Sequence, residues 1–362
     1  MRSIAGTAPL SLPLRGLARS MTFTVLPLIL LLVVILSSGI GAMPIAPGQV
    51  LAIIASKIGI TLPWAFDEGQ AGVLLAVRLP RVCLGILIGG GLAASGAAMQ
   101  GLFRNPLADP GLIGVSSGAA LGAISMIVLG DTLFTDLPKA LESYLVPCAA
   151  FLGSLAITIA VYRISSKGGR QTVATMLLTG IAINAIAGAA TGLLTFVATD
   201  AQLRSITFWS LGSLGAGTWE AVGAVAPFVL VALLLLPRQA HALNALTLGE
   251  EEAGHIGIDV NRVKRIVVVL TSLAVGASVA MAGIIGFIPL IAPHLIRFLI
   301  GPDHRYLIGG SALAGAILLL GADLAARTIA APAELPIGIV TAAIGAPFFL
   351  WLLIRAQKGG LG

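Results

Sequence analysis

Residues 82–101 read Val82-Cys-Leu-Gly-Ile-Leu-Ile-Gly-Gly-Gly-Leu-Ala-Ala-Ser-Gly-Ala-Ala-Met-Gln-Gly101, a run that contains no charged side chain. An α-helix rises 1.5 Å per residue, so about 20 apolar residues cross a hydrocarbon core roughly 30 Å thick. The run is rich in glycine and alanine, which let helices approach closely where lipid provides no hydrophobic force between them. This stretch therefore predicts a membrane-spanning helix that packs against other helices.

The rest of the chain has the same character. Of its 362 residues 57% are hydrophobic and only 10% are charged, whereas soluble domains carry about 25% charged residues. A soluble fold would expose too much apolar surface, so the composition predicts a protein that lies in a lipid bilayer. Glycine is abundant at 45 residues, and candidate helix contacts are the pairs Gly85 with Gly89, Gly118 with Gly122, and Gly188 with Gly192.

Applied along the chain, this length requirement predicts ten spans and hence an all-α polytopic membrane protein. Residues 1–21 form an N-terminal tail, and residues 22–362 form one ten-helix domain. The third, eighth and ninth spans are short, as tilted or broken helices would be. The expected spans are 22–40, 82–101, 114–130, 144–162, 173–197, 220–237, 266–283, 287–300, 306–321 and 337–354.

The placement of lysine and arginine predicts the orientation, because cytoplasmic loops carry an excess of both. With the N-terminus inside, 15 of the 21 basic residues lie on the cytoplasmic side. The opposite orientation reverses this ratio, so we expect both termini in the cytoplasm. The net charge of +6 then follows from membrane topology and requires no nucleic-acid partner. The six outer basic residues are Lys57, Arg78, Arg81, Lys139, Arg204 and Arg327.

The sequence lacks an energy source of its own. None of its five lysines follows a glycine, so it has no Gly-Lys-Ser/Thr phosphate loop. There is no His-Glu-x-x-His motif and no paired acid within a span, and we expect no catalytic residue and no bound metal. His294, beside Pro293, is interpreted as a structural histidine rather than a proton relay. Either the chain is a passive channel or a separate subunit supplies the energy.

Residues 238–265 form the longest polar stretch after the N-terminal segment, and they lie on the predicted cytoplasmic side. Thr247 and Glu250 have the spacing of a capping box. Glu250, Glu251 and Glu252 make an acidic first helical turn, in which each carboxylate stabilises the helix by about 0.3–1 kcal/mol. The pattern predicts a short cytoplasmic helix whose first-turn charges can be removed at little cost.

The same segment predicts a bend into the next span. Leu248, Ala253 and Ile256 can share one helix face, Gly257 is placed to end the helix in a left-handed conformation, and Asp259 can cap the following helix. Such a helix-glycine-helix elbow could dock into a groove of a partner protein. The alternative is an ordinary solvated loop.

Three stretches resemble the iron-siderophore, haem and cobalamin permeases of bacterial ABC importers. Their order and spacing match that family from residue 78 to the end of the chain. The first is Arg78-Leu-Pro-Arg81 with Gln100-Gly-Leu-Phe-Arg-Asn-Pro-Leu-Ala-Asp-Pro-Gly111, and the second is Leu248-Gly-Glu-Glu-Glu-Ala-Gly-His-Ile-Gly257. The third comprises Gly286-Phe-Ile-Pro-Leu-Ile-Ala-Pro-His294, Gly301-Pro-Asp-His-Arg305, Ala322-Asp-Leu-Ala-Ala-Arg327 and Glu334-Leu-Pro-Ile-Gly338.

This resemblance implies a type II ABC importer permease in the bacterial inner membrane. It implies two halves of inverted topology, helices 2–5 against 7–10, and a homodimer with the pathway along its interface. It also implies two ATP-binding cassette subunits, which use ATP and Mg, and a periplasmic substrate-binding protein. The chain itself is then a transporter subunit that binds no cofactor and catalyses no reaction.

The resemblance also carries roles to particular residues. Arg78, Arg81 and Arg327 match outward arginines that pair with carboxylates of the binding protein; without the resemblance they read as interfacial anchors. The cytoplasmic gate falls on Asn105, Leu107, Thr172, Val173 and Ala174. Residues 172–174 depart from the more polar Ser/Thr pattern of the cobalamin branch. The alternative for Asn105 is an Asn-Pro turn residue. Coupling to the ATPase falls on Leu248, Gly249, Glu250, Glu251, Glu252, Ala253 and Gly257.

The stretch Arg104-Asn-Pro-Leu-Ala-Asp109-Pro-Gly resembles the haem branch most, so the expected cargo is haem or a related iron chelate moving from periplasm to cytoplasm. Alternatives are a ferric siderophore, cobalamin, or an ion-coupled secondary transporter. The four histidines form no ladder of axial iron ligands along the outer path. This suits a carrier, because a tight iron–histidine bond would retain the cargo.

Overall fold

The structure, a computed structural model, describes residues 12–133, 138–166 and 172–358. Within these ranges the chain forms helices and no strand. The helices are α1 (Leu12–Gly39), α2 (Pro47–Ser56), α3 (Glu68–Val73), the π-helix η1 (Leu74–Arg78), α4 (Leu79–Leu102), the 3₁₀-helix η2 (Pro110–Ile113), α5 (Val115–Leu133), α6 (Lys139–Ile164), α7 (Val173–Val197), α8 (Asp200–Leu211), α9 (Trp219–Leu235), the 3₁₀-helix η3 (Pro237–Gln239), α10 (Ala240–Leu246), α11 (Glu250–His255), α12 (Val260–Ala282), α13 (Ile288–Ile300), α14 (His304–Ile329) and α15 (Ile337–Lys358).

Each predicted span coincides with one of these helices, namely α1, α4, α5, α6, α7, α9, α12, α13, α14 and α15. Among the described residues, seven helical segments are long and apolar enough to cross a membrane, whereas the apolar parts of α5, α13 and α15 are shorter. The all-α polytopic fold is therefore confirmed. The ninth span was wrongly predicted to be short, because α14 continues past Asp323 and Arg327 to Ile329. These charges pair within the chain, so they do not end the helix.

The first helix also begins earlier than the sequence indicates. It starts at Leu12, so residues 12–21 of the predicted tail are helical, and residues 1–11 lie outside the described part of the chain. Because Arg19 is charged, hydropathy alone places the start of this helix after residue 19. The Arg19 guanidinium lies 4.3 Å from the centroid of the Tyr306 ring, a cation–π contact between α1 and α14.

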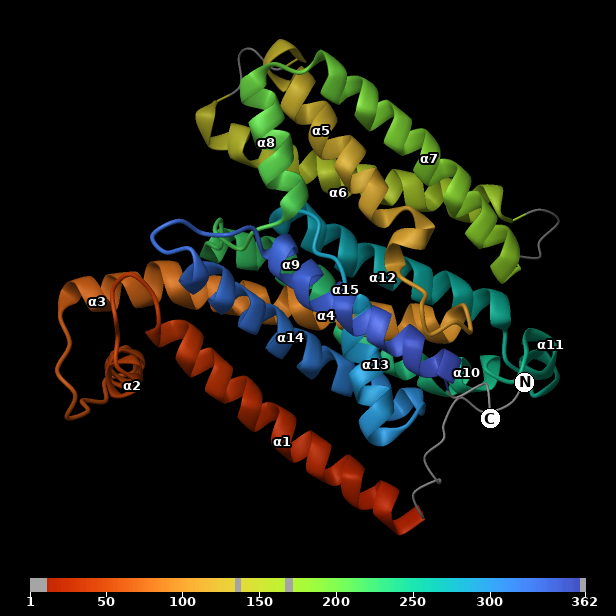
Figure 1. Cartoon of the computed structure of the whole chain (residues 1–362), viewed down its shortest axis with the longest axis horizontal. Helices are drawn as coiled ribbons and strands as arrows, with labels where there is room; N and C mark the ends of the chain where they lie inside the picture. The colour runs from red at the N-terminus through yellow and green to blue at the C-terminus, as the bar shows by residue number, and fades with distance from the viewer. Residues whose placement is uncertain (1–11, 134–137, 167–171, 359–362) are drawn as a thin grey trace.

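The glycine-rich helix α4 is the centre of the bundle, with 20 of its 24 residues buried. It packs against α14, α12, α9 and α13 (Figure 1). A Cβ atom on Gly89 would lie 2.8 Å from the carbonyl carbon of Gly315 on α14, so the two backbones are in contact there. Small residues thus replace hydrophobic attraction as the basis of packing.

The other predicted glycine contacts have different outcomes. Gly118 and Gly122 on α5 pack directly against Gly153 and Ala149 on α6, as predicted. Gly188 and Gly192 on α7 were predicted as contacts too, but a Cβ at either position meets nothing within 4 Å in the described chain. Their i, i+4 spacing indicates only that they share a face, and the neighbouring helices do not cover that face.

Figure 1 shows how the remaining helices surround this centre. Helices α5 to α8 form one group next to α12, and α1 runs along α14 on the opposite flank. Helices α2 and α3 lie at one end of the bundle, which we call the arginine end after Arg78, Arg81 and Arg327. Helices α10 and α11 lie at the other end, which we call the elbow end after residues 238–265.

Candidate functional site

A π-helical turn positions the first two arginines of the arginine end. Pro80 has no amide hydrogen and its ring clashes with the carbonyl four residues earlier, so an α-helix cannot pass through it undisturbed. The wider turn η1 precedes Pro80, and the amide of Leu79 donates to the carbonyl of Leu74. The carbonyl of Leu75, released by this turn, accepts a hydrogen bond of 2.9 Å from the Trp219 indole. Arg78 and Arg81 flank the proline within this fixed segment.

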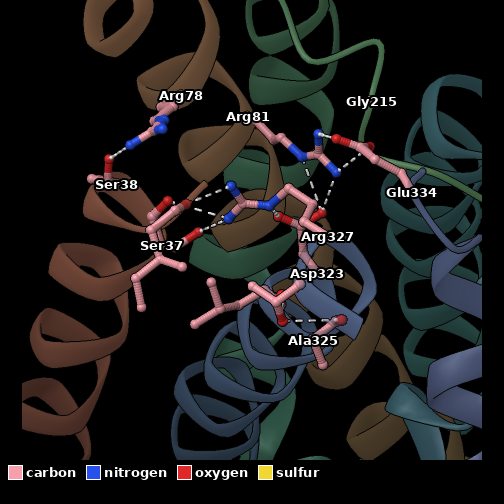
Figure 2. Close-up of polar contacts among 12 residues, drawn as sticks. Ser37, Ser38, Arg78, Arg81, Gly215, Asp323, Ala325, Arg327 and Glu334 are labelled. Atoms are coloured by element: carbon pink, nitrogen blue, oxygen red, sulfur yellow. Dashed lines mark hydrogen bonds and ion pairs between the residues drawn. The ribbon is translucent and has the colours of Figure 1, made fainter. Parts of the chain in front are cut away.

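Arg78 binds the end of α1. Its guanidinium donates to the carbonyls of Ser38 at 2.7 Å and Gly39 at 2.8 Å, and also to the carbonyl of Met43 (Figure 2). The last carbonyls of a helix have no partner within the helix, so a buried cation here satisfies them. The Arg78 residue is only 5% exposed. It therefore acts in this structure as a C-terminal cap for α1.

Arg81 binds two carboxylates from the other half of the chain. It donates to Asp323 Oδ1 from Nε at 3.0 Å and from Nη2 at 2.8 Å, and to Glu334 from Nη1 and Nη2 at 2.9 Å each (Figure 2). The side chain of Asp323 is fully buried. The Arg81 guanidinium holds the pKa of the Glu334 carboxyl below its usual range.

Arg327 completes the cluster. Its Nε lies 3.1 Å from Oδ2 of Asp323, one helical turn earlier on α14. Its Nη2 also donates to the Ser37 hydroxyl at 2.8 Å, which links α14 to α1. Figure 2 shows Asp323 between the guanidinium groups of Arg81 and Arg327. Three arginines minus two carboxylates leave the cluster one positive charge.

The predicted docking arginines thus come together at one end of the bundle, yet each is held by acceptors of its own chain. A role in binding a partner stays a prediction. Sequence reasoning missed Asp323 and Glu334 as the partners of Arg81. The signal was present, because both acids follow predicted spans on the same outer side as the arginines.

The predicted gate residues lie in two separate segments, the turn after α4 and the start of α7. Asn105 Oδ1 accepts from the Leu107 amide at 2.9 Å, which makes the Asn-Pro turn that the sequence indicates, and Leu107 is 44% exposed. Thr172 caps α7, its hydroxyl accepting from the Thr175 amide at 3.1 Å, while Val173 packs against the core and Ala174 is exposed. Helix α7 also contacts η2 through Asn184, whose side-chain amide donates to the carbonyl of Gly111 at 3.1 Å. The gating role itself stays a prediction.

The elbow is built around a buried ion pair. Lys264 on α12 is completely buried, and its ammonium lies 2.6 Å from Oε2 of Glu250, the first residue of α11. Gly257, at φ +90°, ends the short helix in the left-handed region, and Asp259 caps α12 by accepting from the Arg262 amide at 3.0 Å. Both of these features agree with the sequence prediction. Lys264 was not expected inside, because the sequence places it within a polar stretch.

Two expectations for the elbow are wrong. Thr247 does not form a capping box with Glu250, because Gly249 occupies the cap position and the Thr247 hydroxyl donates to the carbonyl of Asn244. Leu248, Ala253 and Ile256 also do not share one face. Ala253 is fully buried, whereas Leu248 is 72% and Ile256 is 66% exposed. The elbow therefore presents two isolated apolar side chains beside the exposed carboxylates Glu251 and Glu252.

The elbow is also tied to the start of α14. Asn244 on α10 donates to Asp303 Oδ1 at 2.8 Å, and its Oδ1 accepts from the His304 amide at 2.9 Å. Hydrogen bonds, chiefly those from the Arg305 side chain, hold the pKa of the Asp303 carboxyl well below its usual range. This carboxylate therefore stays ionised and keeps α10 attached to α14 over the physiological pH range.

Comparisons with known proteins agree with this architecture. A model of the FecCD transport family matches residues 29–355. The chain is 47% identical over 292 residues to the hemin transport system permease protein HmuU of Yersinia pestis (81% of this chain, 86% of that protein). It is 41% identical over 314 residues to the cobalamin import system permease protein BtuC of Halobacterium salinarum (86% and 82%). A solved metal-chelate type ABC transporter in an inward-facing conformation aligns with a TM-score of 0.80 at 32% identity (93% and 99%). This polytopic α-helical chain is a permease that belongs to the FecCD transport family.

Proposed function

We propose that this permease is the membrane subunit of an ATP-driven importer that moves haem from the periplasm to the cytoplasm. The pathway lies along the interface of a permease homodimer. Two ATPase subunits bind ATP and Mg, and a periplasmic binding protein delivers the cargo. The chain itself binds no cofactor. Support for haem comes from the 47% identity to a hemin permease, against 41% and 38% for two cobalamin permeases.

The observation that carries the ATP-driven mechanism is the elbow. The elbow exposes Leu248 and Ile256 on either side of a short helix that the Glu250–Lys264 ion pair holds in place, with the exposed carboxylates Glu251 and Glu252 beside them. Exposed apolar anchors with a charged rim are what a protein interface requires. We assign this surface to the ATPase subunit, so in this proposal the elbow end faces the cytoplasm and, with it, the start of α1 and the end of α15.

Helix α14 supports a mechanical link between the two ends. It has 26 residues, which corresponds to about 39 Å. Its first residues are bound to the elbow through Asn244, and its last turns carry Asp323 and Arg327 of the arginine cluster. A displacement of the elbow on ATP binding therefore reaches the surface at which the binding protein docks.

Docking of the binding protein requires a change within the arginine cluster. Glu334 is the exposed partner of Arg81, with its side chain 46% accessible, whereas Asp323 is fully buried. A carboxylate of the binding protein can take the place of Glu334 on Arg81 without disturbing Asp323. Glu334→Gln, which removes the competing charge, should then tighten the permease–binding protein complex several-fold and increase its salt dependence. An unchanged or weaker complex in titrations over a salt series would contradict the exchange.

The function is tested by reconstitution. The permease, its ATPase and its binding protein are placed in proteoliposomes, and accumulation of haem, a ferric siderophore and cobalamin is measured with and without ATP. We expect ATP-dependent uptake of haem alone. Uptake of another cargo would refute haem and leave the ATP-driven mechanism intact, whereas uptake without the ATPase would refute that mechanism.

Cobalamin is the second candidate. Curated cobalamin permeases align with a larger share of this chain than the hemin permease does, 86% and 92% against 81%. Residues 172–174 depart from the more polar Ser/Thr pattern of the cobalamin branch, and the same uptake assay decides between the two cargoes.

A further inference from the structure

An apolar groove lies between α6 and α12, away from the arginine cluster and from the predicted gate. Its volume is about 210 Å³. One wall comes from α6 and includes Leu155, Ile159 and Tyr162, and the other comes from α12 and includes Val268 and Val269. Ile159 and Val269 are each 49% exposed, so the groove is open along the outer surface of the bundle.

The groove has a closed end and a charged end. At the closed end α6 and α12 touch, because Ser154 packs directly on Gly276. At the other end are Arg163 and Arg265, both exposed. From residue 155 to residue 163 a helix rises about 12 Å, close to the roughly 15 Å depth of the acyl-chain layer of one leaflet.

Both arginines can take an anionic ligand. In the part of the chain that the structure describes, neither guanidinium forms an ion pair with a carboxylate. Arg265 lies within hydrogen-bond reach of the Tyr162 hydroxyl, and Asp259 attracts it at longer range. Arg163 lies in the last turn of α6. Two cations from different helices therefore lie at the mouth of the groove.

A second polar feature lies deeper in the groove. Thr158 lines it and is 3% exposed, and its hydroxyl has no hydrogen-bond partner among the described residues. A buried hydroxyl without a partner is unfavourable in an apolar environment. It lies about one helical turn from Tyr162, the separation at which an ester carbonyl follows the phosphate of a phospholipid.

We propose that this groove binds one anionic phospholipid of the leaflet at the elbow end. The phosphate lies between Arg163 and Arg265, and one acyl chain lies along Ile159 and Val269 as far as the Ser154–Gly276 contact. An ester carbonyl accepts the Thr158 hydroxyl hydrogen once that side chain turns toward the groove. Basic pockets between membrane helices are suited to anionic headgroups. A zwitterionic lipid binds less well, because its own ammonium group is repelled by the two guanidinium groups.

The test is native mass spectrometry of the full-length chain in detergent, titrated with phosphatidylglycerol or with phosphatidylcholine of the same acyl chains. The wild type should retain one phosphatidylglycerol and discriminate against phosphatidylcholine. Arg163→Gln with Arg265→Gln should lower the phosphatidylglycerol affinity about 30-fold, since each surface arginine contributes about 1 kcal/mol to anionic lipid binding. Arg238→Gln with Arg262→Gln removes the same charge from exposed sites outside the groove and should have a much smaller effect.

A third variant tests the apolar part. Val269→Phe keeps both arginines but fills the groove, and it should also lose the retained lipid. These positions are exposed, so thermal unfolding midpoints should match the wild type and rule out a folding defect. Equal affinity in the Arg163/Arg265 and Arg238/Arg262 variants, full retention by Val269→Phe, or equal binding of both lipids would overturn the proposal. Displacement by glycerol 3-phosphate would assign the arginines to a soluble phosphate instead.

Discussion

Arg81 and Glu334 are joined by two parallel hydrogen bonds of 2.9 Å across 253 positions of sequence. This two-point geometry is among the strongest that a guanidinium and a carboxylate make. It fixes the loop before α15 against the start of α4, and it leaves the outer face of Glu334 in contact with solvent.

The Arg81–Glu334 pair predicts a pH dependence of stability. The pKa of Glu334 is lowered in the folded protein, so its contribution is complete above the unfolded value of about 4.3 and is lost as pH falls through the lower folded pKa. The thermal midpoint of the wild type should therefore exceed that of Glu334→Gln at neutral pH, and the gap should close below about pH 4. The effect is modest because the carboxylate is half exposed. A gap independent of pH in detergent unfolding scans would contradict this assignment.

Asp323 is the centre of the arginine cluster, and its removal should be severe. Asp323→Ala leaves Arg81 and Arg327 close together without the buried carboxylate between them. Breaking a buried ion pair from one side costs about 3–5 kcal/mol. Denaturant unfolding of the purified protein measures the loss, with the exposed Thr328→Ala on the same helix as the control. Equal stability of the two variants would show that the buried charge is dispensable.

The three elbow glutamates should not be equivalent. Glu250→Ala removes the carboxylate that lies 2.6 Å from the buried Lys264 ammonium, so we expect a loss of roughly 2–3 kcal/mol, reduced from the fully buried case because Glu250 is partly exposed. Glu251→Ala should cost only about 0.3–1 kcal/mol in helix stability. Limited proteolysis at the elbow, followed over denaturant concentration, separates the two. The ion pair with Lys264 therefore replaces the sequence-based expectation that all three carboxylates can be removed at little cost with a larger expected loss at Glu250.

Gly118 and Gly188 are each followed by a second glycine four residues later, yet replacement by alanine should have opposite effects on stability at the two positions. Gly118→Ala places a methyl group against Gly153 and 2.8 Å from the Ile157 Cβ, so overpacking should destabilise the chain by about 1–3 kcal/mol. Gly188→Ala meets open space and should be neutral or stabilise α7 by up to about 1 kcal/mol. Unfolding midpoints of the two single variants provide the comparison. The same response in both would mean that α5–α6 packing is not close there.

The link between Asn244 and α14 predicts an uncoupled variant. Asn244→Ala removes the hydrogen bonds to Asp303 and the His304 amide, while the exposed elbow surface stays intact. We expect normal assembly with the ATPase but less cargo transported per ATP hydrolysed. His241→Ala, an exposed position on the same helix, is the matched control. If Asn244→Ala proteoliposomes transport as much cargo per ATP as the wild type, the link between Asn244 and α14 is not part of the coupling mechanism.

Much of the fold could be predicted because hydropathy is a one-dimensional signal. Each span can be recognised by the length of its apolar run. Even the short helix α13 was predicted at residues 287–300, and the structure has it at Ile288–Ile300. The short helices α2, α8 and α10 were missed, because fewer than 13 residues cannot be distinguished from loops by this measure. The helical state of residues 322–329 was missed because Asp323 and Arg327 look like the edge of a span when their partners are unknown.

The candidate site was predictable as a location and not as a set of contacts. Charge counting places Arg78, Arg81 and Arg327 on one side of the membrane, and the structure brings them to one end. Nothing local indicates that Arg81 meets Asp323, which is 242 positions away. Lys264 was missed for a similar reason, since its burial depends on Glu250 folding back across the elbow.

The position of α1 has a consequence for how the protein is made. Among the described spans it is the most apolar and the least buried, and its main contacts are with α14. The Ser37 hydroxyl meets Arg327, which is 290 positions later. At about 5–20 residues synthesised per second, α1 waits roughly 15–60 s for this partner. During that interval the contacts with α14 do not exist, so the high apolarity of α1 holds it in the membrane before its main tertiary contacts form.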